Sequence, residues 1–273
     1  MGRDRDLHAI GKATIFTRGL DLNYSEIAPK TDTEVDLTDK VILITGAGAG
    51  IGAELAITAA SKGATVLLLG RTEEKLNTVY DAIIAQGCPE PVVIPMDLSK
   101  LDEQQANQLS HQIGDAFGRL DGLVHNASLL GKLGPIANTN LSEWSQVMSV
   151  NAFAPVVLTK ALLPLLNESP AASILFTSSS VGKQGRAFWG AYAASKFATE
   201  GIAQILAAET ESNENVRVNC INPGATATAM RRAAFPGESP DTIASTASLM
   251  PAYCFLLSDA SKHLHGRSID LQR

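Results

Sequence analysis

The sequence lacks the features that would place a protein outside a reducing, aqueous compartment. It has only three cysteines, Cys88, Cys220 and Cys254, an odd number at wide spacing that does not support a disulfide framework. No secretory signal precedes them, and no uninterrupted apolar run approaches the roughly 20 residues that a membrane-spanning helix needs. We therefore expect a cytoplasmic protein that does not enter a membrane.

Excess basic charge and metal-ligand clusters are also missing. The 22 lysines and arginines face 28 aspartates and glutamates, giving a formal net charge of -6. This balance argues against a nucleic-acid-binding surface, which usually carries excess positive charge. The five histidines are His8, His111, His125, His263 and His265, and none has cysteine or carboxylate partners at ligand spacing, so we expect no metal site.

From Lys40 onward, short apolar runs alternate with longer helical patterns. KVILIT, TVLLL, PVVIPM, DGLVHNA, ASILFTSS and VRVNCINPG are separated by segments such as EEKLNTVYDAIIAQ. Such alternation predicts an α/β protein, a doubly wound Rossmann fold with a parallel sheet of about seven strands and helices on both faces. Because no low-complexity linker interrupts it, we expect one domain over residues 39–273, with ligands at the carboxyl ends of the strands.

Residues 1–38 differ from the rest of the chain. MGRDRDLHAIGKATIFTRGL is mildly basic and DLNYSEIAPKTDTEVDLTDK is acidic, and neither half contains a long apolar segment. We expect a flexible N-terminal tail, because chain ends without buried contacts are usually mobile. A targeting peptide is the alternative, but Asp4 and Asp6 stand where transit peptides have few acids.

The segment LITGAGAGIGAEL joins a predicted strand to a predicted helix through a glycine-rich turn. Gly46 and Gly48 begin a G-x-G-x-x-G pattern, but position 51 is Ile, and the lysine of a Walker loop is absent. The spacing that fits is Gly46, Gly50 and Gly52. Backbone N–H groups at a helix N-terminus can bind a phosphate when side chains do not block its approach. By itself, the segment could also be only a tight turn.

The second motif, GAYAASKFATEG, places Tyr192 and Lys196 four residues apart, on one face of a predicted helix. A carbonyl that accepts a hydride becomes an alkoxide and needs a proton. A phenol has a pKa near 10 and exchanges protons poorly at neutral pH unless its anion is stabilised. We therefore expect Lys196 to lower the pKa of Tyr192, which would act as the general acid or base.

Together these motifs resemble the short-chain dehydrogenase/reductase family. The resemblance runs from about residue 40 to 260, and five motifs follow in the expected order: TGAGAGIG, MDLS, HNAS, the YAASK segment after FTSSSVG, and NPGATAT. The stretch FTSSSVGKQGRAFWGAYAASKFATEG, with HNASLLG, is most similar to the YciK-type group of bacterial oxidoreductases. Ser128 replaces a glycine of the family pattern, which affects only the geometry of that turn.

The resemblance implies roles for further residues. Ser179, thirteen positions before Tyr192, would hold the substrate oxygen, although three consecutive serines can also simply satisfy a strand end. Asn151 in VMSVNAF would anchor a water that links Lys196 to solvent. The predicted cofactor contacts are Gly46, Gly50, Ile51, Gly52, Arg71, Asp97, Leu98, Asn126, Ala127, Pro223, Gly224, Thr226 and Thr228, together with Tyr192 and Lys196.

The end of the second predicted strand, LLLGRTEEKL, bears on the choice of nicotinamide cofactor. NAD-binding versions of the fold usually place an acid there for the ribose 2′-hydroxyl. Here residues 67–70 contain no acid and Arg71 follows, so a 2′-phosphate would meet a guanidinium. We predict NADP(H) rather than NAD(H). The alternative is that Arg71 merely pairs with Glu74.

The expected activity is hydride transfer between a nicotinamide and a carbonyl or alcohol substrate, and the alternative is a non-catalytic NAD(P)-binding sensor or scaffold. The segment 225–250 would form a substrate lid. Its Arg231 and Arg232 could recognise an anionic substrate or cofactor phosphate, although solvated surface charge is the favoured interpretation. Family members commonly form homodimers or homotetramers, and the apolar helix 153–166 is a candidate interface, although core packing explains it equally well.

Overall fold

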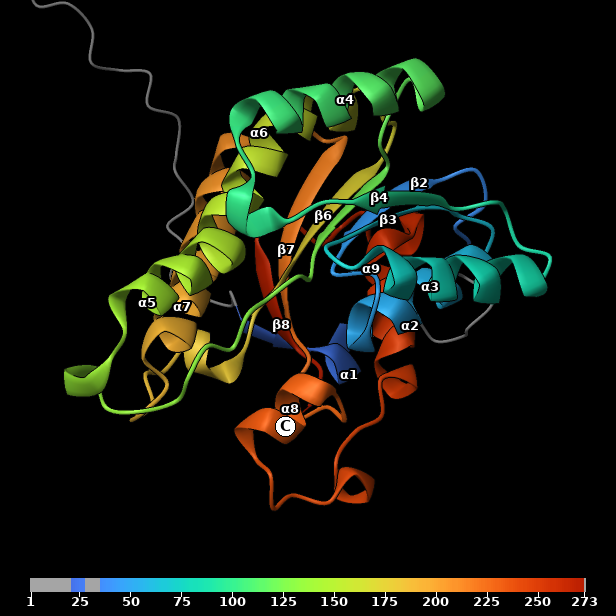
Figure 1. Cartoon of the computed structure of the whole chain (residues 1–273). Coiled ribbons are helices and arrows are strands. Elements are labelled where there is room, and N and C mark those ends of the chain that lie inside the picture. Colours follow the sequence, from blue (N-terminus) through green and yellow to red (C-terminus); the bar gives the residue numbers. More distant parts are fainter. Residues whose placement is uncertain (1–20, 28–34, 273) are drawn as a thin grey trace, which may run out of the picture.

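The computed structural model describes residues 21–27 and 35–272 (Figure 1). Within them, one sheet of eight parallel strands has the order β1-β8-β7-β6-β5-β2-β3-β4. This confirms the predicted doubly wound α/β fold. The strands are β1 (Asp21–Asn23), β2 (Val41–Thr45), β3 (Thr65–Gly70), β4 (Val92–Pro95), β5 (Gly122–His125), β6 (Ala172–Thr177), β7 (Val216–Asn222) and β8 (Arg267–Asp270).

Helices cover both faces of the sheet because the central strands are apolar on both sides. Along β2, Ile42 and Ile44 pack on one face and Leu43 packs on the other, and all three are completely buried. The first face carries α2 (Gly50–Ser61), α3 (Glu73–Ala85) and α9 (Met250–Leu257), and the second carries α4 (Glu103–Phe117), α6 (Ala154–Asn167) and α7 (Gly190–Glu209).

The sheet order places a ligand crevice at the carboxyl ends of β2 and β5. From β2 the chain proceeds to β3 on one side, and from β5 it proceeds to β6 on the other side. Such a switch point leaves a crevice between the loops that follow the two strands. Further loops reach the same edge, and they contain α5 (Leu141–Met148) and α8 (Ala229–Ala234) (Figure 1).

Part of the segment that we expected to be a tail belongs to the sheet. Asp21–Asn23 pairs with Ser268–Asp270 as edge strand β1, and α1 (Tyr24–Ile27) follows. Lys183 donates to Asp21 at 2.7 Å and to Asp270 at 3.2 Å, which neutralises acids on both strands. Val35 and Leu37, also within the expected tail, are buried in the core, and residues 1–20 and 28–34 lie outside the described residues.

The stretch Leu141–Asn167 is continuously helical and apolar enough to cross a membrane by length and composition, with a mean hydropathy of 1.5. It comprises α5, a π-helical turn at Ser149–Phe153 and α6. In its most apolar window, 56% is buried, and α6 packs in the core beside α4. Packing against the sheet therefore accounts for much of its apolar character.

Candidate functional site

The glycine loop between β2 and α2 comes very close to the loop that follows β5. Gly46 has a φ of +70°, a conformation that residues with a Cβ rarely adopt. A Cβ at Gly52 would lie 2.3 Å from the Gly46 carbonyl oxygen and 2.6 Å from the Asn126 amide nitrogen. Asn126 in turn donates from its side chain to the Thr45 carbonyl at 3.1 Å. These contacts explain why the helix begins with glycines.

The N-terminus of α2 has donors available for an anion. Ala49 occupies the N-cap position and supplies no side-chain hydrogen bond to the first turn. Ala49, Gly50 and Ile51 line the main cavity, so the first-turn backbone faces that cavity. A 12-residue helix presents partial positive charge at this end, and the glycine loop therefore fits a phosphate group.

Arg71, Asp97 and Leu98 lie farther along the same edge of the sheet. The Ala47 N–H donates to the Leu69 carbonyl at 3.1 Å, and the Met96 N–H donates to the Gly70 carbonyl at 2.8 Å. These bonds hold the ends of β2, β3 and β4 together. Asp97 caps the short turn Leu98–Lys100 by accepting from Ser99 N at 3.0 Å. The Arg71 side chain is exposed and forms no ion pair with Glu74 among the described residues.

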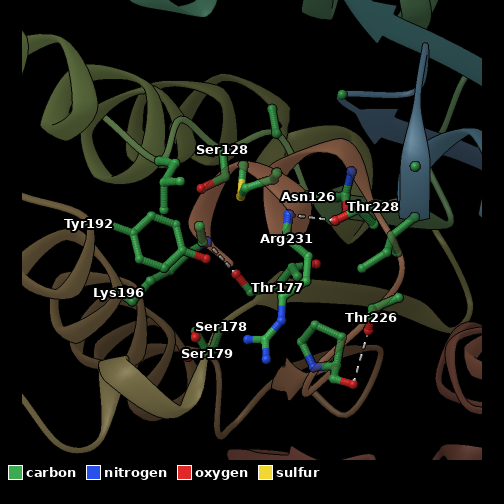
Figure 2. A pocket seen from close by; sticks show the side chains of 18 of the residues that line it. Asn126, Ser128, Thr177, Ser178, Ser179, Tyr192, Lys196, Thr226, Thr228 and Arg231 are labelled. Atoms are coloured by element: carbon green, nitrogen blue, oxygen red, sulfur yellow. Dashed lines mark hydrogen bonds between the residues drawn. The ribbon is translucent and has the colours of Figure 1, made fainter. Parts of the chain in front are cut away.

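Most of the predicted site residues line one cavity of about 330 Å³ between these loops and α7 (Figure 2). Gly52, Arg71, Asp97, Leu98 and Asn151 do not line it. The cavity thus joins the glycine loop to the tyrosine motif, as the order of motifs suggested. The predicted residues that line it are Gly46, Gly50, Ile51, Asn126, Ala127, Ser179, Tyr192, Lys196, Pro223, Gly224, Thr226 and Thr228.

Tyr192 and Lys196 lie in the first two turns of α7 and are both buried. The Lys196 ammonium nitrogen is 5.5 Å from the centre of the Tyr192 ring and donates to the Thr177 carbonyl at 2.7 Å, at the end of β6. Figure 2 shows both side chains on the same side of the cavity. Burial lowers the pKa of Lys196 to about 8, although Cys220 and Glu200 act in the opposite direction.

The expected lowering of the Tyr192 pKa is wrong for this structure. Burial raises the pKa of Tyr192 to about 12, and the hydroxyls of Ser179 and Ser128 only partly offset this effect. Desolvation penalises the phenolate more than these neighbours stabilise it. Tyr192 is therefore protonated in this structure, and its raised pKa makes it a weaker acid than a free tyrosine.

The serine triplet after β6 divides into three environments. Ser179 lines the cavity and reaches Tyr192, whereas Ser180 is exposed. Ser178 is buried and also lines the cavity, but its hydroxyl has no hydrogen-bond partner among the described residues. A buried polar group without a partner is costly, so this hydroxyl fits a site that receives a polar ligand. The three serines therefore do more than form hydrogen bonds at the end of β6.

Asn151 lies in the π-helical turn and stabilises the site from behind the cavity. Its side-chain oxygen accepts from Leu129 N at 2.7 Å, and its amide donates to the Leu129 carbonyl and to the Ser195 hydroxyl, both at 2.9 Å. Ser195 donates to the Tyr192 carbonyl at 2.7 Å. In this structure Asn151 thus connects α7 to the loop after β5 and has no direct bond to Lys196.

Comparison with known proteins gives the family. The model of the short chain dehydrogenase family matches residues 40–239. The uncharacterized oxidoreductase YciK of Escherichia coli (strain K12) is 50% identical over 244 residues, which cover 89% of this chain and 95% of that protein. The chain belongs to the short-chain dehydrogenase family. The expected similarity to the YciK-type group is also confirmed.

More distant relatives and solved structures agree. Dehydrogenase/reductase SDR family member 7C of Xenopus tropicalis is 35% identical over 191 residues, 68% of this chain and 60% of that protein. A short-chain dehydrogenase from Shigella flexneri complexed with NADP has a TM-score of 0.84 at 49% identity, covering 87% of this chain and 98% of that one. One from Escherichia coli CFT073 complexed with NADPH has a TM-score of 0.85 at 48% identity, with coverages of 90% and 100%.

Several residues of this short-chain dehydrogenase site were not predicted from the sequence. Ser128, Leu130 and Trp189 line the cavity beside Tyr192. Arg231 also lines it, which corrects the favoured interpretation that this arginine is solvated surface charge; its neighbour Arg232 is exposed. All four residues lie in segments that the sequence analysis had singled out, but no role was assigned to Ser128, Leu130 or Trp189.

Proposed function

We propose that this short-chain dehydrogenase is an NADP(H)-dependent oxidoreductase that interconverts a carbonyl and an alcohol. The main support is that Tyr192, Lys196 and Ser179 line the same cavity as the glycine loop. The bound nicotinamide supplies the hydride at the carbonyl carbon. A sensor or scaffold would have no need of this proton-transfer machinery, so the structure favours the enzyme.

The protein residues would bind the substrate oxygen and provide its proton. Ser179 and Tyr192 would donate hydrogen bonds to the oxygen, and Tyr192 would transfer its proton there as negative charge develops. Lys196, held by the Thr177 carbonyl at 2.7 Å, would stabilise the phenolate that remains. Asn151 would keep α7 and the loop after β5 in register through its bonds to Leu129 and Ser195.

The proposal is tested by following NADPH absorbance with a panel of ketones, aldehydes and quinones. With any substrate that is turned over, Tyr192→Phe should lower kcat by about 10²- to 10⁴-fold. Tyr80→Phe is the matched control because Tyr80 lies on α3 and donates to Glu90 at 2.8 Å, outside the cavity lining. Near wild-type turnover by Tyr192→Phe would contradict the mechanism.

The choice of NADP(H) rests on Arg71. Its exposed side chain follows β3 at the edge where β2, β3 and β4 end, and no acid precedes it on that strand. The solved relatives complexed with NADP and NADPH support the assignment. Arg71→Ala should weaken NADPH binding by about tenfold to a hundredfold, the value of a charged hydrogen bond, and leave NADH binding unchanged.

A fluorescence titration of both nucleotides measures these affinities. Lys160→Ala is a suitable control, since it removes an exposed lysine on α6 that pairs with Glu103. Tighter binding of NADH than of NADPH by the unmodified protein would overturn the assignment.

We also propose a homodimer or homotetramer formed through α6 and α7. Two large apolar side chains at the start of α6 are exposed, Phe153 by 61% and Val156 by 42%. Two more are exposed on α7, Phe197 by 46% and Ile205 by 60%. Exposed large apolar side chains of this kind are often covered by a partner. Phe197→Glu should shift the molecule toward monomer in analytical ultracentrifugation, whereas Ile136→Glu, at an exposed site outside these helices, should not.

Two further assignments complete the proposal. Cys88, Cys220 and Cys254 are all free, which suits the reducing cytoplasm, and immunolocalisation or cell fractionation tests this. Residues 225–250 would act as the substrate lid, and residues 227–243 within this segment are here called the α8 loop. Its ends are joined where Thr226 bridges to Ala244 and the Ala227 N–H donates to the Ala244 carbonyl at 2.9 Å.

A further inference from the structure

The α8 loop places a cation next to the reacting residues. Arg231 lines the cavity together with Tyr192 and Ser179, and Met230 and Ala234 from the same helix line it too. In Figure 2 the Arg231 side chain extends between Tyr192 and Thr226. A guanidinium at this position is within the space that a substrate would use.

The Arg231 guanidinium forms an ion pair with a carboxylate of its own loop. Its Nε and Nη2 atoms donate to the two carboxylate oxygens of Glu238, both at 2.6 Å. The two side chains are 26% and 25% exposed, and the guanidinium lowers the pKa of Glu238. Because the partners are only seven residues apart, this bidentate pair can open without disturbing the sheet.

Aromatic rings connect this ion pair to the catalytic tyrosine. The Arg231 guanidinium carbon is 3.8 Å from the centre of the Phe235 ring. Phe235 lies 5.7 Å from Trp189, and Trp189 lies 5.8 Å from Tyr192, measured between ring centres. Trp189 and Tyr192 line the cavity, Phe235 lies behind Trp189, and the neighbouring rings are tilted by 58° and 39°, so a row of apolar rings leads from the proton donor to a guanidinium.

A second cation reinforces the positive charge. The Arg186 guanidinium carbon lies 5.6 Å from the Trp189 ring centre and 5.4 Å from that of Phe235. Arg186 has no carboxylate partner within the described part of the chain. Glu238 thus offsets Arg231, whereas no salt bridge within the described residues offsets Arg186.

We infer that the substrate is an oxo acid or hydroxy acid with an apolar body, whose carboxylate replaces Glu238 on Arg231. The apolar body would lie along Trp189, and Arg186 would attract the acid to the cavity. This inference rests on the proposed function. In reduction, the carbonyl carbon gains the hydride that NADPH supplies and its oxygen gains the Tyr192 proton, while the carboxylate takes no part in the chemistry.

Matched probes separate the charge from the rest of the substrate. Suitable pairs are para-acetylbenzoate with para-acetylbenzamide, and para-acetylphenylpropanoate with its amide. Turnover is followed by NADPH absorbance, and binding to the NADPH-loaded protein is followed by the shift in melting temperature. The wild type should prefer at least one acid to its amide by about tenfold or more, the value of a charged hydrogen bond.

The variants act on one partner at a time. Arg231→Gln should remove the preference for the acid and change the kcat/KM of the amide less than about twofold. Glu238→Gln should raise kcat/KM for the acid by about two- to fivefold, because the competing carboxylate is gone and an ion pair near the surface contributes about 1 kcal/mol or less. Arg232→Gln, which removes the adjacent exposed arginine, should leave the preference unchanged.

Each other outcome overturns the inference. Equal turnover of acids and amides would refute the charge preference and leave the proposed function standing. Equal loss for both probes in Arg231→Gln would show that this arginine only supports the loop. Weaker NADPH binding in that variant, with the acid preference intact, would assign Arg231 to a cofactor phosphate. If no probe is turned over, the melting-temperature shifts decide, and equal shifts from acid and amide refute the inference.

Discussion

Replacing Gly52 by alanine tests how closely the glycine loop must pack. The added Cβ would lie 2.3 Å from the Gly46 carbonyl oxygen, so the two must separate by about 1 Å to reach an ordinary contact of about 3.4 Å. Both partners are backbone or are tied to it, since the nearby Asn126 amide is fixed by the Thr45 carbonyl. Overpacking of this kind costs about 1–3 kcal/mol of the free energy of unfolding.

Binding should suffer as well, because the start of α2 must move away from β2. A displacement near 1 Å in a positioning element costs about a hundredfold, and we expect NADPH affinity to fall by tenfold to a hundredfold. Denaturant unfolding and NADPH fluorescence measure the two effects. Gly114→Ala is the control, because Gly114 also lies in a helix but its added Cβ would meet the flexible end of the Leu165 side chain at 3.3 Å. The free energy of unfolding of this control should change by less than about 1 kcal/mol. Wild-type stability and affinity in Gly52→Ala would refute the reasoning.

Three further outcomes follow from the structure. Lys196→Met should abolish turnover yet raise the free energy of unfolding at pH 7 by up to about 3 kcal/mol, because folding lowers the pKa of this lysine from 10.5 to about 8. This gain in stability should shrink as the pH rises from 8 to 10.5, which denaturant unfolding at several pH values measures. Burial lowers the pKa of His125 from 6.5 to about 3, so the stability of the wild type should fall as the pH drops from 6.5 to 3. In acid unfolding curves, His125→Phe should lose less stability than the wild type over the same pH range. Gln272→Ala removes side-chain hydrogen bonds of 2.6 and 3.0 Å to the Pro223 and Ala225 carbonyls. This variant should bind NADPH several-fold more weakly, while its melting temperature should change by no more than a few degrees.

The sequence was informative where the function depends on local pattern. Two-sided apolar strands predicted the sheet, and the positions of Gly46 and Tyr192 relative to those strands predicted that they meet at one edge. An i, i+4 spacing placed Lys196 beside Tyr192 without knowledge of the fold. These relations are set within one element or by the order of elements.

The properties that were missed depend on contacts between distant segments. Asp21–Asn23 is too short and too polar to indicate a strand, and its pairing with β8 is a tertiary contact. Trp189 lines the cavity together with Thr226 and Met230, which come from the loop after β7. The pKa of Tyr192 rises through burial by several elements, so a local rule based on Lys196 gave the wrong direction.

The base of the α8 loop has a kinetic consequence. Thr226 and Thr228 line the cavity next to the glycine loop, and Thr226 also bridges to Ala244, where the α8 loop ends. A nucleotide that binds against these threonines, as we propose, would fix the base of the loop before any substrate is enclosed. Steady-state turnover should accordingly follow a compulsory order, in which the nucleotide enters first and leaves last, and product inhibition patterns would display that order.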